Sequence, residues 1–318
     1  MRAWSGTGTR PLVVAFGGNA LLPDMDDPSA AEHRAREFAE ALLLLLPDHA
    51  GLVLVHGNGP QVGAILLRVE ATRDRIPPEP LDVLVAETQG SIGYLLERAL
   101  REALTAAGRH IEVATVGTQI VVDPADPAMQ KPSKPIGPFY PPEEGMGLAE
   151  RHGWDVVEVP GRGVRRVVPS PRPIEVVEIH TIADAARHGH LVIAGGCGDV
   201  AVGKNEGGTV HSVEAVIDKY RTAGLLASSL RAGGLVILTA VAHVSTGFGT
   251  ADERPIHEMA ADRAEELLAA GEFPPGSMGP KVEAAAAYAR EMRRPALITS
   301  VAALPAALTG SDGTWITD

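Results

Sequence analysis

Short glycine turns after buried apolar strands are the first feature of this sequence that could support chemistry. A Gly-Gly-Asn turn at 17–19 follows the apolar run 12–16, and a Gly-Asn-Gly turn at 57–59 follows a second run at 52–55. Without a Cβ, a glycine lets the chain turn sharply and lets backbone N–H groups approach an anion. Asn19 can also cap a following helix, whose positive end then faces the same point. These turns predict anion sites built from backbone; strand-to-helix turns without a ligand remain the alternative.

The lysines are the second chemical signal, because they are scarce and unusually placed. All lie in or beside segments rich in glycine or proline: Lys131, Lys134, Lys204, Lys219 and Lys281. A lysine in a glycine-lined site is a mobile point charge suited to a transferring phosphoryl group. For any one lysine, a solvated position at a loop tip explains the placement equally well.

Other motifs predict less. Residues 198–205 have the spacing of a phosphate loop, but Asn205 replaces the Ser or Thr that would reach Mg²⁺, and no helix follows. Residues 57–63 resemble a dinucleotide turn without the acidic residue that a ribose needs. The histidines do not cluster with acids, and Cys197, the single cysteine, excludes a disulfide framework. We expect Cys197 to be a small buried filler, with an activated thiol as the alternative.

The elements that must position these residues indicate an α/β protein. The unit of strand, glycine turn and helix occurs twice within about the first 75 residues, with a helix predicted over 29–46. Such repeats predict a parallel, doubly wound sheet with ligands at the strand ends. Buried strands are also predicted at 190–196 and 235–244, and an edge strand at 313–317. The long helix within 77–108 contains Gly90 and Gly93, so we expect close packing or ligand approach near Gly90.

The segment 123–177 has a different texture from the rest of the chain. Prolines crowd into it, and its lysines and arginines stand out in an acidic protein. We predict an inserted, lid-like subdomain of loops and hairpins within a single domain that spans 1–318. A crossover stiffened by proline, without a role in chemistry, is the alternative.

Composition excludes several classes of function. The net charge of −12 argues against nucleic acid or an anionic membrane as the main partner, although a few placed lysines suffice for a phosphate. No run approaches the roughly 20 apolar residues that span a bilayer. We therefore expect a cytoplasmic protein whose ligand is a small molecule.

Taken together, these segments resemble carbamate kinase, a member of the amino acid kinase superfamily. The resemblance covers nearly the full length, and its motifs occur in the family's order: AFGGNALL, VLVHGNGPQVG, PLDVLVAETQGSIGYLLERAL, DPADPAMQKPSKPIGPFY, RRVVPSPRPIEVVE, EAVIDKY, LTAVAHV, FPPGSMGPKVEAA and GTWI. The combination is far more specific than any single motif.

The resemblance implies a three-layer α/β/α sandwich around a mainly parallel sheet, a protruding subdomain and a homodimer. It also implies Mg²⁺-dependent phosphoryl exchange between carbamoyl phosphate plus ADP and carbamate plus ATP. Three lysines would act on the phosphates, and by likeness these are Lys134, Lys219 and Lys281. The small acid and the transferring phosphate would be held by Gly17, Gly18, Asn19, Gly57, Asn58 and Gly59. The nucleotide would lie along Gly195, Gly196, Ala240, Val241, Phe248 and Met278.

The sequence departs from the family pattern at the predicted transfer site. The family's Ile-Asp-Lys-Asp is Ile217-Asp218-Lys219-Tyr220 here, which removes an acid expected to orient the lysines. The family's run of four glycines is interrupted by Cys197. Met129 and Ser133 are milder changes in the subdomain motif.

Three hypotheses follow from these departures. The first is a working carbamate kinase whose lysines are oriented by another acid, with Asp218 and Asp199 as candidates. The second is a relative that acts on another small acid or on a compound like carbamoyl phosphate in a specialised pathway. The third is a catalytically silent dimer that binds a ligand or partner and regulates.

Overall fold

A mainly parallel sheet forms the centre of the molecule. The computed structural model describes residues 10–17, 28–46, 51–196, 199–274 and 276–318. Its eight-stranded sheet has the order β15-β17-β16-β12-β1-β2-β9-β3, and every neighbouring pair is parallel except β16 with β17. The strands are β1 (Leu12–Phe16), β2 (Leu52–His56), β3 (Val113–Val116), β9 (Leu191–Gly196), β12 (Gly234–Thr239), β15 (Glu258–Ala260), β16 (Ala296–Ser300) and β17 (Thr314–Thr317).

Helices cover both faces of this sheet, and the strands alternate between two hydrophobic clusters. On β1, Val13 and Ala15 pack into one cluster, whereas Leu12, Val14 and Phe16 pack into the other. Residues of α6 (Ile179–Arg187), α7 (Lys219–Ser229), α8 (Ala261–Ala269) and α9 (Gly279–Met292) join the first cluster. Residues of α2 (Pro28–Leu43), α4 (Leu81–Ala106) and α10 (Leu304–Leu308) join the second. This arrangement confirms the predicted α/β/α sandwich, because the central strands β1, β2 and β9 are buried on both faces.

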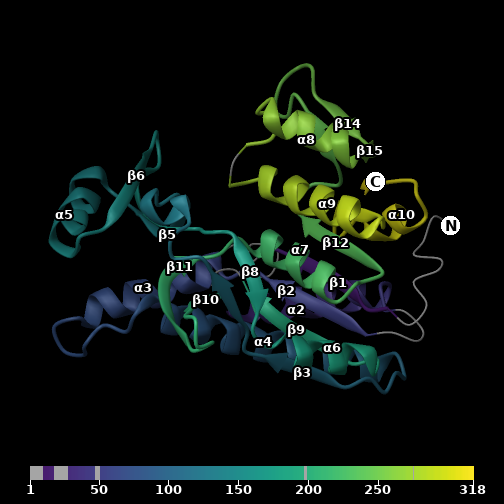
Figure 1. Cartoon of the computed structure of the whole chain (residues 1–318), viewed down its shortest axis with the longest axis horizontal. Helices are drawn as coiled ribbons and strands as arrows, with labels where there is room; N and C mark the ends of the chain where they lie inside the picture. Colours follow the sequence, from purple (N-terminus) through teal and green to yellow (C-terminus); the bar gives the residue numbers. More distant parts are fainter. Residues whose placement is uncertain (1–9, 18–27, 47–50, 197–198, 275) are drawn as a thin grey trace.

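A separate three-stranded antiparallel sheet projects from the main body (Figure 1). It consists of β5 (Lys134–Tyr140), β7 (Gly163–Val168) and β6 (Asp155–Val159), with α5 (Pro142–His152) beside it. These elements lie within the segment 123–177, which was predicted to be a lid-like subdomain. The short helix η1 (Pro127–Gln130) and β8 (Pro173–Val176) complete that segment.

A four-stranded sheet joins this projecting unit to the body. Its order is β11-β10-β4-β8, with β4 (Gln119–Val122), β10 (Val200–Lys204) and β11 (Val210–Val216). β8 therefore pairs with β4 and not with the three-stranded sheet, although β8 lies inside the predicted subdomain segment. The helix α3 (Gly59–Thr72) packs beside β5, where Gly63 lies against the backbone of Gly137.

One local expectation from sequence is wrong, and the close packing expected near Gly90 occurs at Gly93. The strand at 314–317 is not an edge, because β15 pairs with it on the side away from β16. Within α4, Gly90 has open space beside it, and the tight packing belongs to Gly93, where a Cβ would come within 2.3 Å of Thr115 Cγ2.

The remaining described elements are the hairpin of β13 (Val244–Thr246) and β14 (Arg254–Ile256), which lies near α8 and β15 (Figure 1). None of the helices described here is both long enough and apolar enough to cross a bilayer.

Candidate active site

The predicted glycine turns meet at one edge of the central sheet. β12, β1, β2 and β9 are adjacent and parallel, so their carboxyl ends lie together. Gly17 follows β1, the turn 57–59 follows β2, and Gly195 with Gly196 ends β9. This is the edge at which open α/β sheets bind ligands. Gly18, Asn19, Cys197 and Gly198 lie outside the described residues.

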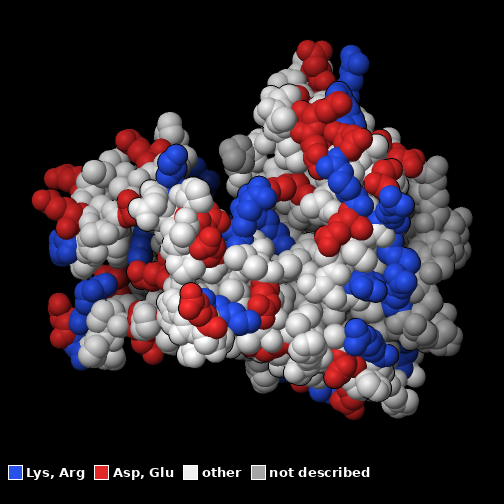
Figure 2. Space-filling model, in the orientation of Figure 1, with Lys and Arg blue, Asp and Glu red and all other residues white. Residues whose placement is uncertain are grey.

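Three elements bring the predicted catalytic lysines to this edge. Lys134 is the first residue of β5 in the projecting unit, Lys219 is the first residue of α7, and Lys281 lies in the first turn of α9. Figure 2 shows the face of the molecule hollowed between the projecting unit and the body, with Lys and Arg side chains on the wall of the hollow.

Asp218 connects two of these elements with one carboxylate. It is the N-cap of α7, where its side chain accepts a hydrogen bond from the N–H of Tyr220 at 3.0 Å. The same carboxylate accepts from Lys134 Nζ at 2.7 Å. Burial alone would raise the pKa of Asp218, but the nearby charges of Lys134 and Lys219 hold it below its ordinary value. The Asp218 carboxylate therefore stays ionised at neutral pH, and its bond to Lys134 ties the projecting unit to α7.

Tyr220 lies between the other two lysines. Lys219 Nζ is over the Tyr220 ring at 4.4 Å from its centroid, and Lys281 Nζ is over the same ring at 4.6 Å. The ring is only 6% exposed. A Cβ at Gly17 would lie 3.6 Å from the Tyr220 hydroxyl oxygen, so the side chain reaches the end of β1. Tyr220 therefore connects both lysines with the first glycine turn.

Lys281 is held in a buried, electropositive position. Its Nζ donates to the carbonyl oxygen of Ser277 at 2.8 Å, and the residue is 8% exposed. Burial, together with the neighbouring charges of Lys219 and Lys134, lowers the pKa of Lys281 from 10.5 to about 8. An anion bound here would favour the charged form further and raise this pKa.

His56, at the end of β2, is a site neighbour that sequence reasoning missed. It is buried, and burial lowers the pKa of its ring from 6.5 to about 4, with a smaller contribution from the charge of Lys219. The ring is therefore neutral at pH 7. It fills the space beside Gly196, where a Cβ would come within 2.6 Å of His56 Cε1. The position of His56 directly after an apolar strand was the only sequence signal for it.

The backbone N–H groups of Gly195 and Gly196 donate hydrogen bonds to buried side chains. Gly195 N–H donates to Thr118 Oγ1 at 2.9 Å, and Gly196 N–H donates to Asp199 Oδ1 at 2.8 Å. These glycines can therefore offer a phosphate close approach but not these two N–H donors. Gly195 has a φ of +78°, which also favours glycine at that position.

Asp199 is buried beneath this turn. Burial raises the pKa of its carboxyl group from 3.8 to about 7. Among the described groups, Asp199 Oδ2 has no hydrogen-bond partner. Asp199 accepts from the N–H of Gly196 and has Thr222 beside it, so of the two acids considered from sequence only Asp218 pairs with a catalytic lysine.

A hydrogen bond to α4 fixes the turn 57–59 that follows β2. Asn58 is buried, and its Nδ2 donates to Thr88 Oγ1 at 2.7 Å. Thr88 Oγ1 donates in turn to the carbonyl oxygen of Val85 at 2.6 Å. Gly57 is buried and Gly59 is half-buried as the first residue of α3. The Asn58 amide nitrogen thus positions the turn.

The predicted adenine-side residues are less closely gathered. Ala240 is exposed and Val241 half-buried in the loop after β12, whereas Met278 is half-buried at the N-cap of α9. Phe248, in the loop between β13 and β14, is 63% exposed. The contacts of the described residues connect only Met278 with a catalytic lysine, since it precedes the helix that carries Lys281.

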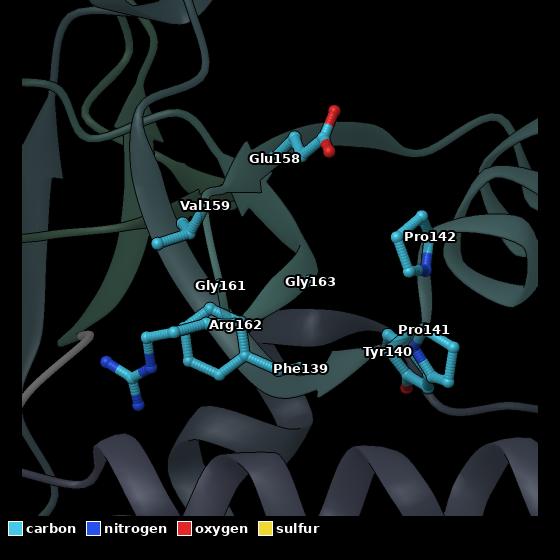
Figure 3. A pocket seen from close by; sticks show the side chains of 9 residues that line it. All are labelled: Phe139, Tyr140, Pro141, Pro142, Glu158, Val159, Gly161, Arg162 and Gly163. Atoms are coloured by element: carbon cyan, nitrogen blue, oxygen red, sulfur yellow. The ribbon is translucent and has the colours of Figure 1, made fainter.

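Two cavities lie away from the lysines. One, of about 430 Å³, is on the projecting unit, where Arg162 lies over Phe139 at 4.2 Å with Pro141 and Pro142 opposite (Figure 3). The other, of about 370 Å³, lies between α7 and α9. Neither is lined by a predicted site residue.

The second cavity contains an ion-pair network that the sequence did not predict. Glu283 on α9 accepts from Arg221 on α7, with Nε at 3.1 Å and Nη2 at 3.0 Å. Glu283 also accepts from Arg172 Nη2 at 3.2 Å. Since Arg221 follows Tyr220 and Glu283 follows Lys281 by two residues, this network joins the two helices that carry catalytic lysines.

The chain is similar to proteins of known activity along nearly all of its length. Residues 10–300 match the sequence profile of the amino acid kinase family. The carbamate kinase of Thermococcus kodakarensis is 41% identical over 310 residues, which is 96% of this chain and 98% of that protein. The carbamate kinase of Clostridium perfringens is 40% identical over 311 residues, which is 96% of this chain and 99% of that protein.

The fold of this chain is also similar to that of a carbamate kinase of known structure. The carbamate kinase from Giardia lamblia, bound to AMP-PNP, superposes with a TM-score of 0.89 at 35% identity. The match covers 98% of this chain and 99% of that one.

Proposed function

This chain belongs to the amino acid kinase family, and from that premise we propose that it is a carbamate kinase. It exchanges a phosphoryl group between carbamoyl phosphate plus ADP and carbamate plus ATP. The identity of about 40% to carbamate kinases over nearly the whole chain supports this assignment. The match to a carbamate kinase bound to AMP-PNP supports the use of ATP and ADP.

The observation that carries the proposal is the convergence of Lys134, Lys219 and Lys281 on Asp218 and Tyr220. Phosphoryl transfer passes through a loose transition state whose charge lies on the phosphoryl oxygens, so catalysis needs alignment and positive charge. Ammonium groups from three elements supply both.

The reaction needs no general base. A carbamate oxygen is already anionic, and it attacks the γ-phosphorus while the bond to the bridging oxygen breaks and ADP leaves with the electron pair. In the other direction, a β-phosphate oxygen of ADP attacks carbamoyl phosphate. We assign Gly17, Gly18, Asn19 and the turn 57–59 to the small acid and the transferring phosphate.

The nucleotide is assigned to the remaining predicted residues. Gly195 and Gly196 would line the phosphates by close approach. Ala240, Val241, Phe248 and Met278 would border the adenine. The exposed side chain of Phe248 is able to cover a planar base.

Mg²⁺ would be bound through the nucleotide. Of the two described carboxylates near the lysines, Asp218 is paired with Lys134 and Asp199 is fully buried. No group of three or more His, Cys, Asp or Glu side chains able to hold a metal occurs among the described residues. The ion would neutralise the nucleotide's phosphates while the lysines align the transferring group.

We also propose a homodimer, as the resemblance implies. Light scattering on the purified protein should then give twice the mass of one chain. A mass of one chain at micromolar concentration would contradict this assembly.

The other two hypotheses are not favoured. The gathered lysines argue against a silent regulator, and the identity of about 40% to carbamate kinases over nearly the whole chain argues against another small acid as acceptor. Tyr220, in place of the family's acid, leaves Asp218 as the carboxylate that contacts Lys134.

The test is ATP formation from carbamoyl phosphate, ADP and Mg²⁺ by the purified protein. We expect turnover that Lys134→Met reduces by about 10²-fold or more, because one transition-state contact is lost. The matched control is Lys204→Met, which removes an exposed lysine paired with Glu175 and should leave the rate unchanged.

Several results would contradict the proposal. ATP formation from acetyl phosphate and not from carbamoyl phosphate would support another acceptor. No turnover, together with no thermal shift on adding AMP-PNP, would support the silent regulator.

A further inference from the structure

The contacts of Tyr220 show two ammonium groups held by one aromatic ring. Lys219 Nζ and Lys281 Nζ lie 4.4 and 4.6 Å from the ring centroid, within the roughly 6 Å at which a cation interacts with a ring face. The lysines come from different helices, α7 and α9, and meet only through tertiary packing. The ring is therefore a shared contact for both charges.

Besides burial, the charge of Lys219 opposes that of Lys281 and helps to lower the Lys281 pKa. The repulsion is large in a buried site, and the Lys281 side chain is 8% exposed. Asp218 is the nearby carboxylate, but it is already bonded to Lys134 and to the N–H of Tyr220. Asp218 also favours the charged form of Lys281, and the negative face of the Tyr220 ring, 4.6 Å from Lys281 Nζ, supplies a second attraction.

We propose that Tyr220 is a positioning residue for phosphoryl transfer, and that its ring holds Lys219 and Lys281 close to one another and to the end of β1. This inference rests on the proposed carbamate kinase activity and deepens it. A ring face attracts an ammonium group without accepting conventional hydrogen bonds from it. Substrate oxygens therefore do not have to displace a carboxylate before they bind these lysines.

The position of the ring relative to β1 sets where the lysines act. The Tyr220 hydroxyl oxygen would lie 3.6 Å from a Cβ at Gly17, at the turn assigned to the small acid. The backbone of Tyr220 is fixed as well, because its N–H donates to the cap Asp218. Ring, cap and strand end together define one location for the transferring group.

The test measures the titration of Lys281 in the protein without substrates. The chain has five lysines, so ¹³Cε-lysine labelling gives few signals, and single Lys→Arg variants assign them. The charged groups that act on Lys281 are Lys219 and Asp218 from α7 and Lys134 from β5, and none of them is substituted in the Tyr220 variants.

Four forms of the protein separate a ring–cation contact from simple space filling. Tyr220→Phe keeps the ring face and should leave the Lys281 pKa near its starting value of about 8. Tyr220→Leu keeps apolar volume without the face and should lower this pKa by about half a unit to one unit. Tyr220→Asp adds a negative charge and should raise it by roughly a unit or more. Equal values for Phe and Leu would overturn the proposal.

Controls keep the comparison interpretable. Tyr288 is another buried tyrosine on α9, and its hydroxyl donates to the carbonyl oxygen of Ala232. Tyr288→Leu should lower the melting temperature without moving the Lys281 titration. If Tyr220→Leu does not fold, Tyr220→Met makes the same comparison with a flexible apolar side chain.

The Lys281 titration tests the role of the ring, and the activity assay tests the proposed function, so the two proposals can be contradicted separately. In the activity assay, Tyr220→Phe should stay within about threefold of the parent, whereas Tyr220→Leu should lose about tenfold or more in kcat/KM. The protein could form no ATP while the Lys281 pKa still changes as predicted in Tyr220→Leu, Tyr220→Phe and Tyr220→Asp. That result would overturn the proposed function and leave the contact of the ring with the lysines standing. ATP formation together with the same Lys281 pKa in all the Tyr220 variants would overturn the role of the ring alone.

Discussion

At the scale of single residues, the Asp218 carboxylate joins a helix cap to a catalytic lysine. It accepts from the N–H of Tyr220 and from Lys134 Nζ. Because its pKa is held below the ordinary value by the lysines, this contribution to stability is present at neutral pH. It is lost only as the pH falls through the lowered pKa.

The first prediction concerns Asp218→Asn. The asparagine oxygen can still cap α7, so the cap itself should change the free energy of unfolding by no more than about 1 kcal/mol. Loss of the buried ion pair with Lys134 should lower it by more, on the order of 3 kcal/mol. The charge that holds Lys134 is lost, so kcat for ATP formation should fall about 10²-fold. Glu175→Gln, which removes the partner of the exposed Lys204, is the control and should change neither quantity. Full activity in Asp218→Asn would show that Lys134 is positioned by something else.

The second prediction concerns Asp199, whose folded pKa of about 7 is raised from 3.8. Between these pH values the folded state binds more protons than the unfolded state, so stability falls as pH rises from about 4 to about 7 and is level above. Asp199→Asn removes this dependence and can still accept from the N–H of Gly196. The variant's advantage in unfolding free energy should grow across that range to on the order of 2–4 kcal/mol.

His56 makes the variant comparison necessary. Its folded pKa of about 4 lies below the ordinary 6.5, so its contribution to stability is lost as the pH falls from about 6.5 to about 4. This slope opposes that of Asp199 in the same range. Urea unfolding of Asp199→Asn and the parent at several pH values isolates the acid, and a difference that does not vary with pH would contradict the assignment.

At the scale of elements, α4 contains two glycines with opposite surroundings. A Cβ at Gly90 meets nothing within 4 Å, whereas a Cβ at Gly93 would come within 2.3 Å of Thr115 Cγ2 and 2.9 Å of its Oγ1. Thr115 is β-branched and cannot easily turn aside. The helix therefore tolerates alanine at one position and not at the other.

The third prediction compares these two positions by urea unfolding. Gly90→Ala should raise the free energy of unfolding by about 0.5–1 kcal/mol, because it removes backbone freedom from the unfolded chain. Gly93→Ala should lower it by about 1–3 kcal/mol through overpacking. Equal effects of the two substitutions would mean that α4 does not pack on β3 as described.

The ends of α7 and α9 are the elements that decide the site. Arg221 and Glu283 join the two helices one to two residues beyond Tyr220 and Lys281. This link explains how two helix N-termini, each carrying a lysine, stay close together.

At the scale of the whole molecule, the sequence was informative about the sheet and less so about its contacts. The apolar runs before Gly17 and Gly57 predicted β1 and β2, because strands buried on both faces are continuous in hydrophobicity. The edge of the sheet was missed because β15 is three residues long and has no apolar run. In the four-stranded sheet, β4 pairs with β8 and β10, which are far apart from it in sequence, and no local pattern predicts such pairing.

The candidate site divides in the same way. The lysines were found by their glycine- and proline-rich surroundings and by the resemblance to carbamate kinases. The contacts of Tyr220 with Lys219 and Lys281, and the network at Glu283, depend on how α7 and α9 pack. Such contacts between separate elements cannot be read from spacing along the chain.

The most direct test of the account is a crystal structure of the protein soaked with AMP-PNP and Mg²⁺. We predict that oxygens of the terminal phosphoryl group lie within hydrogen-bond distance, about 2.7–3.2 Å, of Nζ of Lys134, Lys219 and Lys281. The group should also face the turn that follows β1. A terminal phosphoryl group bound away from these lysines, with their side chains directed into solvent, would contradict the account.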